Sequence, residues 1–559
     1  MIDLRLLRDK RSFSITGGPP RLALVHHGFR TTQFSFADRR KARFAARFSS
    51  LGLLNLARSL QVDHEQGRLP FAPELRYFDE DCYADDDDLV AAVVEWLRPA
   101  SARFVLAGLY SLAFDRTASM LALLDPSEFC VIVGGAHPTV APNFNYAHLV
   151  VRGEGGRALQ HILTQLLEPA FGQGAEARGI CFQLDGELHM SAPAFDNSLA
   201  TIPPPAFAYE LSESRDDRTV RPQVQWWKAV SKSPQIYVCT QSCRARCTFC
   251  STYLIHGRAV SRPVELIAAD LDYIKEFGHD SIQFHDDDLL QHDQFDQLMD
   301  VLAEKNLLWT CNARSEFMDA ARARQMFAAG CRKVFLGVES LDQRSLDYYR
   351  KATTVEMNQT AVRELDAAGI GVVCGYIIGA PHDTVESLIA DIDRVLELPI
   401  LFLATAILTP DIGTVEFLRA RKKDSKLRML GDDGTAVNIR PRPDLFGAEQ
   451  PYGLPTVSEA VSKSELNELY IYANCAFFLR DASIERLLRT TPPDRAREVQ
   501  DWINIYRGRA EDLARSARLD VVRRRAGALV AATRSTPYRA RSVPDELDSG
   551  LSGNAPGEG

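Results

Sequence analysis

The sequence predicts a chain of the α/β class, with an N-terminal doubly wound, Rossmann-like domain, a partial (β/α)6 barrel and a helical C-terminal region. Two observations predict this architecture. Short apolar runs alternate with helical segments over about residues 21–165, and the alternation resumes over about residues 233–421. Such alternation is typical of parallel sheets whose strands are connected by helices. We therefore expect domains at 1–167, 233–427 and 428–535, a linker at 168–232 and a disordered tail at 536–559.

The apolar runs of the N-terminal domain predict its strands, and the segments between them predict helices. Strands are expected at Leu22–His26, Leu75–Phe78, Phe104–Gly108, Cys130–Val133 and Leu149–Val151. Helices are expected at Leu51–Leu60 and Asp88–Leu97. The acidic run Asp85–Asp88 lies at the start of the second helix, where negative charge is favourable. We interpret that run as a helix start and not as a metal site.

The segment from Glu168 to Lys232 breaks the pattern, because glycines and the proline run Pro203–Pro205 interrupt it. A second series then predicts the strands of an open barrel. They are Gln235–Thr240, Ser281–His285, Leu308–Ala313, Lys333–Val338, Val372–Ile378 and Phe402–Leu408. Helices around Ser462–Leu479 and Ala496–Tyr506 follow. The composition of the tail from Thr536 onward is typical of disorder.

Composition places the chain among globular proteins with a sizeable core. Of 559 residues, 46% are hydrophobic and 25% are charged, which excludes collagen-like and low-complexity proteins. The 65 basic and 74 acidic residues argue against a nucleic-acid surface, which favours a strongly basic domain. Met1 to Pro20 lacks the apolar core of a signal peptide, and the longest apolar stretch is far shorter than the roughly 20 residues that span a bilayer. We expect a cytoplasmic protein that binds neither nucleic acid nor membrane.

The densest chemical signal is a cysteine triplet, Cys243, Cys247 and Cys250, on a loop after the first strand of the second series. Three closely spaced thiolates can hold one soft metal centre, either zinc or an iron–sulfur cluster. Zinc in a structural site takes a fourth protein ligand, and Cys239 is poorly placed to supply it because it lies in the preceding strand. Three ligands to a four-iron cluster would instead leave one iron open for a substrate.

The spacing Cys-x3-Cys-x2-Cys, with Phe249 before the last cysteine, resembles that of the radical S-adenosylmethionine (SAM) superfamily. Further landmarks resembling those of the family follow in the right order at Gly337–Ser340, Lys351–Thr354, Gly375–Gly379 and Leu408–Thr414. The resemblance implies that Cys243, Cys247 and Cys250 hold a [4Fe–4S] cluster, and that SAM contacts Phe249, Glu339, Gly375, Ile377 and Gly379. It also implies one-electron cleavage of SAM to a 5′-deoxyadenosyl radical, with an electron donor such as flavodoxin or ferredoxin.

Three charged residues are weaker catalytic candidates near this site. On the strand that begins at Leu308, alternation places Thr310, Asn312 and Arg314 on one face. Arg314 could meet a carboxylate of the cofactor or substrate, or form a salt bridge at the rim of the barrel. Asp286 and Asp287 stand where the family often has an Asp-Asp pair, and could either position substrate or cap the next helix.

A second resemblance covers about residues 21–165. The stretches Ser49–Ala57, Gly108–Ser111, Val131–Thr139 and Val151–Gly155 resemble the cobalamin-binding domain fused to one class of radical SAM enzymes. This implies cobalamin contacts at Ser111, Gly134, Gly135, His137, Gly153 and Glu154. The cobalt-ligating motif Asp-x-His-x-x-Gly is absent, and the nearest sequence, around His64, follows a predicted helix instead of a strand. We expect cobalamin without a histidine ligand; a domain that no longer binds it is the alternative.

Together the resemblances imply a cobalamin-dependent radical SAM methyltransferase, similar to class B, acting on an unactivated carbon of a small-molecule or peptide substrate in specialised natural-product biosynthesis. The alternative enzyme is a radical SAM cyclisation, rearrangement or oxidation, with cobalamin absent or not methylating. A non-catalytic sensor or scaffold is disfavoured by the intact cysteine triplet and Glu339. A methylthiotransferase is disfavoured because the sequence shows no second set of three cysteines for an auxiliary cluster.

Overall fold

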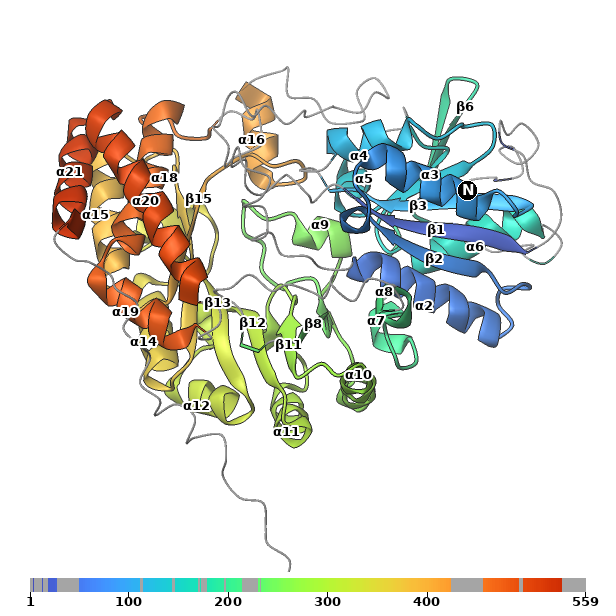
Figure 1. The fold of residues 1–559 in the computed structure, drawn as a ribbon, viewed down its shortest axis with the longest axis horizontal. Coiled ribbons are helices and arrows are strands. Elements are labelled where there is room, and N and C mark those ends of the chain that lie inside the picture. The colour runs from blue at the N-terminus through green and yellow to red at the C-terminus, as the bar shows by residue number, and fades with distance from the viewer. Residues whose placement is uncertain are drawn as a thin grey trace, which may run out of the picture. The chain divides into compact units, whose positions relative to one another are not determined.

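The computed structural model divides into two compact units, Met1–Asn467 and Glu468–Gly559. It describes residues 4, 13, 19–27, 50–110, 114–142, 146–168, 171, 178–195, 198–213, 230–231, 233–423, 456–491 and 496–534. The tail at 536–559, predicted to be disordered, lies outside the described residues. Among the described residues, the first unit contains sheets of seven, six and two strands, and the second unit is helical (Figure 1). The α/β class that the sequence predicts is therefore confirmed.

The N-terminal sheet has seven strands in the order β2-β1-β3-β4-β5-β6-β7. Its parallel strands are β1 (Pro20–His26), β2 (Glu74–Asp79), β3 (Ala102–Gly108), β4 (Cys130–Gly134) and β5 (Leu149–Val151). All five were predicted from the apolar runs. Because β1 is followed by β2 on one side and β3 lies on its other side, the strand order reverses between β1 and β3. In open α/β sheets, ligands bind beyond the carboxyl ends of the strands at such a point.

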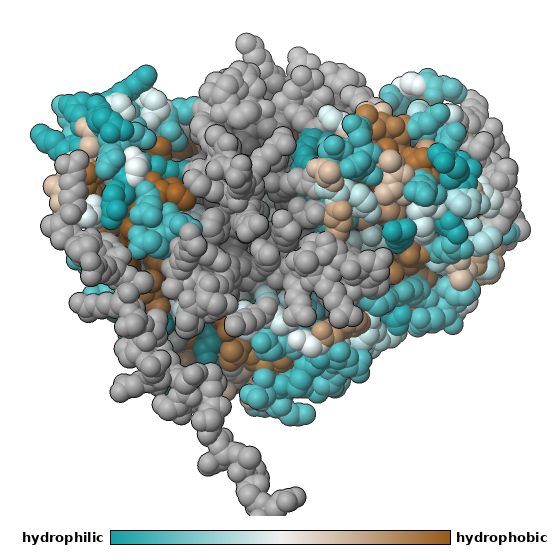
Figure 2. All heavy atoms as spheres, in the orientation of Figure 1, coloured by the Kyte–Doolittle hydropathy of each residue, from teal (hydrophilic) through white to brown (hydrophobic). Residues whose placement is uncertain are grey.

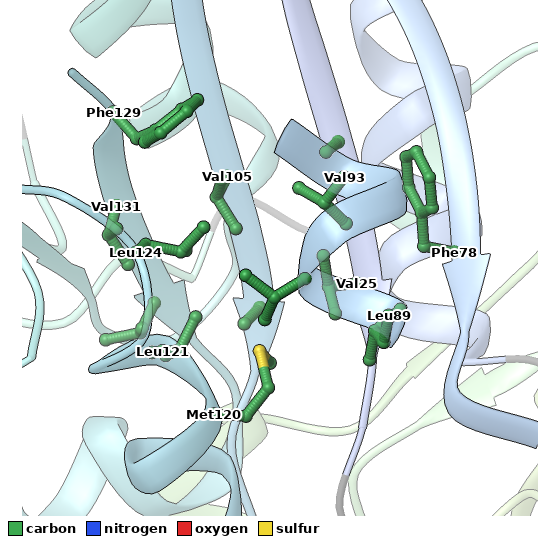
Figure 3. Packing of buried hydrophobic residues seen from close by; sticks show 14 of the residues in the cluster. Val25, Phe78, Leu89, Val93, Val105, Met120, Leu121, Leu124, Phe129 and Val131 are labelled. Atoms are coloured by element: carbon green, nitrogen blue, oxygen red, sulfur yellow. The ribbon is translucent and has the colours of Figure 1, made fainter. Parts of the chain in front are cut away.

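Helices cover both faces of this sheet. α2 (Leu51–Glu65) contacts α6 (Gly156–Leu167), while α3 (Asp86–Leu97) contacts α4 (Phe114–Leu121). Figure 3 shows the core beneath α3 and α4, where side chains from the strands and both helices meet. The labelled residues are Val25, Phe78, Leu89, Val93, Val105, Met120, Leu121, Leu124, Phe129 and Val131. α5 (Ala136–Val140) is a short helix between β4 and β5.

The acidic run at the start of α3 has a structural role, as its position predicts. The Asp85 side chain caps the helix by accepting a hydrogen bond from the backbone N–H of Asp88 at 3.0 Å. Asp86 pairs with Arg116 at 3.1 Å and lies 3.0 Å from the buried ring of His27. Asp86 thus takes part in ion pairs that join α3 to α4.

Two further strands extend the N-terminal sheet. β6 (Ile180–Leu184) and β7 (Glu187–Met190) form an antiparallel hairpin next to β5. They fall within residues 168–232, which the sequence predicts as a linker. The segments that follow β5 and β7 are in close contact. Gly153 and Ala194 form a β-bridge, and a Cβ on Gly153 would lie 2.1 Å from the carbonyl oxygen of Ala194.

The second sheet has six parallel strands in the order β15-β14-β13-β12-β11-β8. The strands are β8 (Pro234–Tyr237), β11 (Ser281–Phe284), β12 (Leu308–Arg314), β13 (Cys331–Glu339), β14 (Gly371–Ile378) and β15 (Phe402–Ile407). Since β8 and β15 are not paired with each other, the barrel is open. Its connecting helices are α10 (Val264–Glu276), α11 (Phe295–Lys305), α12 (Ala320–Ala328), α13 (Gln343–Tyr348), α14 (Val355–Ala367) and α15 (Val385–Leu396).

One predicted strand ends early. The expected strand Gln235–Thr240 stops at Tyr237, and Thr240–Gln241 forms the separate short strand β9, which pairs with β10 (Val260–Ser261). The reason is a contact between distant segments: the backbone N–H groups of Cys239 and Thr240 donate to the carboxylate of Asp286. These donors are therefore directed to a side chain instead of to a neighbouring strand.

A buried ion pair joins residues 198–213 to the barrel. These residues carry the short helices α7 (Ser198–Thr201) and α8 (Glu210–Glu213). Arg262 donates to Asp270 from Nε at 2.6 Å and from Nη2 at 3.1 Å, and its Nη1 donates to the carbonyls of Leu199 and Ile202. Asp270 also accepts the N–H of Ala206. Both charges are almost completely buried, so the hydrogen bonds compensate for lost hydration.

The second unit is described from Glu468 onward. It contains α19 (Asp481–Thr490), α20 (Ala496–Ser516) and α21 (Asp520–Arg534), and α18 (Lys463–Phe478) crosses the boundary between the units. The rings of Phe478 and Tyr506 are stacked, with centroids 4.4 Å apart. The sequence predicts helices around Ser462–Leu479 and Ala496–Tyr506, and α18 and α20 lie at these segments. Within the part of the chain that the structure describes, no helix has the length and apolarity to cross a membrane.

Hydrophilic residues are prominent over the outer helices of the barrel on the face shown in Figure 2. On α10 and α11, residues such as Glu276 and Glu304 are exposed, whereas Ile267, Leu298 and Leu302 are buried against the sheet. Each helix therefore packs an apolar face on the sheet and exposes a polar face, as expected of an amphipathic helix.

Candidate functional site

The three cysteines lie on one loop between β9 and α9 (Thr252–His256). The loop begins at Ser242, whose φ of 68° turns the chain sharply. Gln291 holds this turn from both sides: its Nε2 donates to the carbonyl of Ser242, and its Oε1 accepts the N–H of Arg244, both at 2.8 Å. A buried amide side chain thereby fixes the backbone from which Cys243 projects.

The chemistry of the cysteines suits a soft metal centre. Cys247 is buried, whereas Cys243 and Cys250 are half-buried. Burial raises the pKa of the Cys243 thiol to about 11 and also raises the pKa of Cys250. Thiolates at these positions therefore need a cation to stabilise them, and iron ions in a cluster supply that charge. Cys239 does not fit as a further ligand, because it is fully buried and its thiol donates to Asp286 at 3.4 Å.

Asp286 fixes the start of the cysteine loop. Its Oδ1 accepts the N–H of Cys239 at 3.1 Å, the N–H of Thr240, and the Thr240 hydroxyl at 2.6 Å. Burial raises the pKa of Asp286 to about 6. The sequence offered two roles for Asp286, substrate positioning or helix capping. The capping role is wrong, because Asp288 caps the following 3-10 turn instead.

Asp287 lies beside the helix that follows the cysteines. Its carboxylate reaches solvent and accepts a hydrogen bond from the Thr252 hydroxyl at 3.2 Å. Loss of hydration raises the pKa of the Asp287 carboxyl, and the positive charge of the neighbouring His256 ring lowers it in part. His256 Nδ1 lies 3.3 Å from Nε2 of Gln241. An acidic and an imidazole side chain therefore lie near each other beside the cysteine loop, and the sequence had singled out only Asp287.

Arg314, at the carboxyl end of β12, contacts one of the cysteines. Its Nη1 donates to Sγ of Cys247 at 3.3 Å, and its Nη2 donates to the backbone carbonyl of Lys351. Its Nε forms an ion pair with Glu316. The predicted salt bridge is therefore present, and the contact with a cysteine sulfur was not predicted.

Glu339 forms a buried ion pair with Lys351, whose Nζ lies 2.8 Å from its carboxylate. Glu339 ends β13 with a φ of 65°, a conformation that costs energy for a residue other than glycine. Gly337 makes room for the pair, because a Cβ there would lie 2.6 Å from both Glu339 Oε1 and Lys351 Nζ. Lys351 was not predicted as a site residue; only the structure reveals its pairing.

The remaining residues predicted to contact SAM lie on or next to β14, apart from Phe249. Ile377 and Phe249 pack on the same small core, which contains Tyr349. Gly379 has a φ of 95°, and its N–H donates to Asp383 at 3.0 Å. Gly375 has a packing reason to lack a side chain, because a Cβ would lie 3.0 Å from the ring of Phe335. The predicted residues of the strands thus gather toward the carboxyl ends of β13 and β14.

Polar atoms without hydrogen-bond partners lie in the barrel strands. Among the described residues they include Gln283 Oε1 on β11 and Thr310 Oγ1 on β12. The strand register places both residues on the face that also carries Arg314. Buried polar atoms of this kind usually meet a ligand or water, so the interior of the barrel is suited to a polar ligand.

A separate cavity of about 320 Å³ lies at the carboxyl ends of β3, β4 and β5, beside the first turn of α2. This is the side of the strand-order reversal. Most of its lining residues are apolar. The barrel also contributes to its wall, through Val238 and Gln241 before the cysteines and Ile255 and His256 after them. The cavity therefore lies between the N-terminal sheet and the segments that flank Cys243, Cys247 and Cys250.

The cavity gathers most of the predicted cobalamin contacts. Gly134, Gly135, Gly153 and Glu154 all line it. His137 is buried but does not line it; burial lowers the pKa of this histidine to about 4. Ser111 lies outside the described residues. Glu154 accepts a hydrogen bond from the N–H of Ser198 at 3.1 Å, at the start of α7.

His64 is not part of this cavity. It lies in the last turn of α2, where the sequence had associated it with a helix, and its Nδ1 is 3.3 Å from the carbonyl of Leu69.

Parts of the chain are similar in sequence to known proteins. The family model of the radical SAM superfamily matches residues 237–395. An uncharacterized methyltransferase of Pyrococcus horikoshii is 26% identical over 298 residues, covering 51% of this chain and 61% of that protein. The anaerobic magnesium-protoporphyrin IX monomethyl ester cyclase of Rubrivivax gelatinosus is 23% identical over 291 residues, covering 49% of this chain and 50% of that protein. The chain thus matches half to about three-fifths of the length of these relatives.

Two solved structures share the fold over most of the chain. The cobalamin-dependent SAM radical enzyme OxsB, with aqua-cobalamin bound, gives a TM-score of 0.62 at 14% identity over 88% of this chain and 71% of its own. The radical SAM methyltransferase TsrM of Kitasatospora setae, with cobalamin and a [4Fe–4S] cluster bound, gives 0.59 at 13% identity over 86% and 90%. At these identities the likeness shows the fold.

The superfamily match covers nearly all of β8 through α15, which includes the cysteine loop, Arg314, Glu339 and Gly375. Membership of this superfamily implies a [4Fe–4S] cluster and SAM as cofactors. Residues 237–395 of this chain form a radical SAM domain.

Proposed function

We propose that this chain is a cobalamin-dependent radical SAM methyltransferase acting on an unactivated carbon of a small-molecule or peptide substrate. The observation that carries the proposal is the cavity at the carboxyl ends of β3–β5, whose wall includes His256 and Ile255 from the helix after the cysteines. A cofactor in this cavity would lie next to the cysteine loop. A methyl donor and a radical generator must be close to act on one substrate.

Cys243, Cys247 and Cys250 are the proposed ligands of the [4Fe–4S] cluster. With SAM bound, this cluster supplies a radical that removes a hydrogen atom from the substrate. The chain's own part is to hold the thiolates and to exclude water. Asp286 and Gln291 fix the backbone around the first cysteine, and Arg314 donates to the second.

Glu339 and Lys351 form the proposed polar edge of the SAM site, and Ile377 with Phe249 form its apolar edge. Glu339 and Ile377 lie near the carboxyl ends of neighbouring strands, β13 and β14. A ligand with a charged end and an aromatic base fits such a division. An open barrel leaves one side for the substrate, where the half-buried Ala404 and the exposed Ala406 of β15 leave space.

The fit of cobalamin rests on the walls of the cavity. Cobalamin supplies a cobalt-bound methyl group when present. The half-buried side chains of Leu51 and Leu56 can pack against a flat ring or an aromatic tail, while the half-buried Gly134 and Gly153 carry no side chain that would obstruct it. No histidine of the N-terminal strands or helices lines the cavity within the described residues, which suits binding without a histidine ligand from that domain.

The test is the corrin content of protein purified without oxygen from cells supplied with cobalamin. Stoichiometric corrin supports the proposal, and its absence from protein with an intact cluster refutes it. Gly52 offers a sharp variant, because it lines the cavity, is exposed on α2, and a Cβ there would meet only Ser50 Oγ at 3.9 Å. Gly52→Trp should displace corrin without loss of cluster iron.

Gly508→Trp is the matched control. Gly508 is an exposed glycine of α20, and a Cβ added there would meet no neighbouring atom within 4 Å. The control should retain full corrin. Substrate screening would then look for the mass gain of one methyl group together with S-adenosylhomocysteine and 5′-deoxyadenosine.

A second candidate is a radical cyclisation or oxidation, which the similarity to the anaerobic cyclase of Rubrivivax gelatinosus favours. This reaction also forms 5′-deoxyadenosine. It is distinguished by a product that carries no added methyl group and by the absence of S-adenosylhomocysteine.

A further inference from the structure

Arg314 has an unusual set of partners for a residue at a barrel rim. Its side chain is only 7% exposed. One guanidinium nitrogen donates to Sγ of Cys247 at 3.3 Å, and the other terminal nitrogen donates to the carbonyl of Lys351. The third nitrogen pairs with Glu316. The guanidinium is therefore fixed by contacts on three sides, with one N–H directed at a proposed cluster ligand.

A charged hydrogen-bond donor changes the electron affinity of a cluster. Reduction by one electron makes the cluster and its thiolates more negative by one charge. A guanidinium N–H on a ligand sulfur stabilises that added charge, and burial strengthens the effect because little water screens it. The donor thus favours the reduced state and raises the reduction potential.

We propose that Arg314 sets the reduction potential of the [4Fe–4S] cluster through its hydrogen bond to Cys247. The inference rests on the proposed function in one respect, that Cys247 is a cluster ligand. In the step concerned, one electron passes from a low-potential one-electron donor to the cluster, with no bond broken and no proton transferred. Arg314 is a positioning residue here, because it acts through the cysteine sulfur.

Glu316 allows a test of the direction in which the reduction potential shifts. Its carboxylate pairs with Nε of the same guanidinium and offsets part of its positive charge. Removing this negative charge should therefore raise the potential, whereas removing Arg314 should lower it. A purely structural role of the ion pair would give no such opposition, because both substitutions would loosen the same contact.

The experiment is a redox titration of the reconstituted cluster without SAM or substrate, followed by the electron paramagnetic resonance signal of the reduced form. Iron and sulfide content normalise each sample. Arg314→Gln should make reduction at least about tenfold less favourable, which is about 59 mV for a one-electron couple. Glu316→Gln should shift the equilibrium in the opposite direction. Arg314→Lys, which keeps the charge, should lie between Arg314→Gln and the unmodified enzyme.

Arg244→Gln is the matched control. Arg244 lies on the same loop, but its side chain is 58% exposed and pairs with Asp293. Its removal should move the equilibrium by less than about threefold, since exposed charges are screened. If Arg314→Gln assembles a full cluster with an unchanged potential, the proposal is wrong, and weakened SAM binding in that variant would instead make Arg314 a ligand of the SAM carboxylate.

If Arg314→Gln fails to hold a cluster, Glu316→Gln decides: an unchanged or lowered potential overturns the proposal. These outcomes are separate from failure of the proposed function. An unmodified protein that assembles no iron–sulfur cluster would refute the cysteine ligands themselves, and a protein without corrin would refute methyl transfer while leaving the role of Arg314 intact.

Discussion

Replacing Asp286 by asparagine should leave the enzyme assembled and active, whereas replacing it by alanine should disrupt the cysteine loop. Asp286 Oδ1 accepts hydrogen bonds from the N–H groups of Cys239 and Thr240 and from the Thr240 hydroxyl. Asparagine keeps an acceptor oxygen of the same shape. Alanine leaves all three donors without it.

The magnitudes follow from the burial of these groups. Orphaning a buried donor costs about 1–3 kcal/mol, so three donors cost at least about 3 kcal/mol, which shifts the folded loop equilibrium by more than about a hundredfold. Asparagine at this position also removes a cost that the aspartate carries. The pKa of Asp286 is raised from 3.8 to about 6, so its ionisation at neutral pH costs the fold about 3 kcal/mol, which the neutral amide avoids. This gain offsets weaker hydrogen bonds and an amide group that lacks a partner.

The sign of the pH dependence is fixed by the raised pKa. Between about pH 4 and pH 6 the folded protein binds more protons at Asp286 than the unfolded chain, so its contribution to stability falls as pH rises through this window and is constant above it. The amide of the Asp286→Asn variant does not titrate. The thermal midpoint of this variant relative to the unmodified protein should therefore rise between about pH 4 and about pH 6.5.

The assays are iron and sulfide content, SAM binding and the rate of 5′-deoxyadenosine formation. We expect Asp286→Asn to keep the cluster and a rate within about fivefold, a change of about 1 kcal/mol. Asp286→Ala should lose most of its iron. The structural interpretation is refuted if Asp286→Asn retains the cluster and SAM but loses the rate by more than about a hundredfold, because a carboxylate would then be needed for the chemistry.

Three further substitutions test other parts of the structure. Arg262→Met should lower the free energy of unfolding of the first unit by about 3–5 kcal/mol, since it leaves the buried carboxylate of Asp270 without its cation; a lowered thermal midpoint checks this. Gly153→Ala should also lower that midpoint, because Gly153 has a φ of 80° and a Cβ would lie 2.1 Å from the Ala194 carbonyl; an unchanged midpoint would contradict the geometry. Lys351→Met should weaken SAM binding by at least about tenfold in calorimetry while cluster iron is retained, because the Glu339 carboxylate loses the cation that holds it at the proposed SAM site; unchanged SAM affinity would remove Lys351 from that site.

The sequence predicts the strands of both parallel sheets because buried parallel strands are apolar runs whose ends are marked by turns. It does not predict the hairpin β6–β7, whose second strand is exposed at both ends, Glu187 and Met190, and half-buried between them. The early end of β8 is also not readable. It depends on hydrogen bonds to Asp286, which is 47 residues from Cys239 in the chain.

In the candidate site, too, local features can be predicted from the sequence and contacts between distant segments cannot. The cysteine triplet is local in sequence, so its spacing alone indicates a metal centre. Arg314 is different, because its contact with Cys247 spans 67 residues and arises only where distant segments meet at the rim of the barrel. The sequence could place Arg314 on the correct face of β12, but the partner on that face depends on how neighbouring strands converge.

The glycines of the N-terminal domain show why a sequence resemblance cannot by itself establish cobalamin binding. Gly135 has a φ of 103°, and a Cβ there would lie 3.1 Å from the Leu109 carbonyl, so the fold requires glycine with or without a ligand. Gly153 is required in the same way by Ala194. Gly52 and Gly108 differ, because a Cβ on either would meet only Ser50 Oγ, at 3.9 and 4.0 Å, and both line the cavity. Substitutions at Gly52 and Gly108 therefore test the ligand, whereas those at Gly135 and Gly153 test the fold.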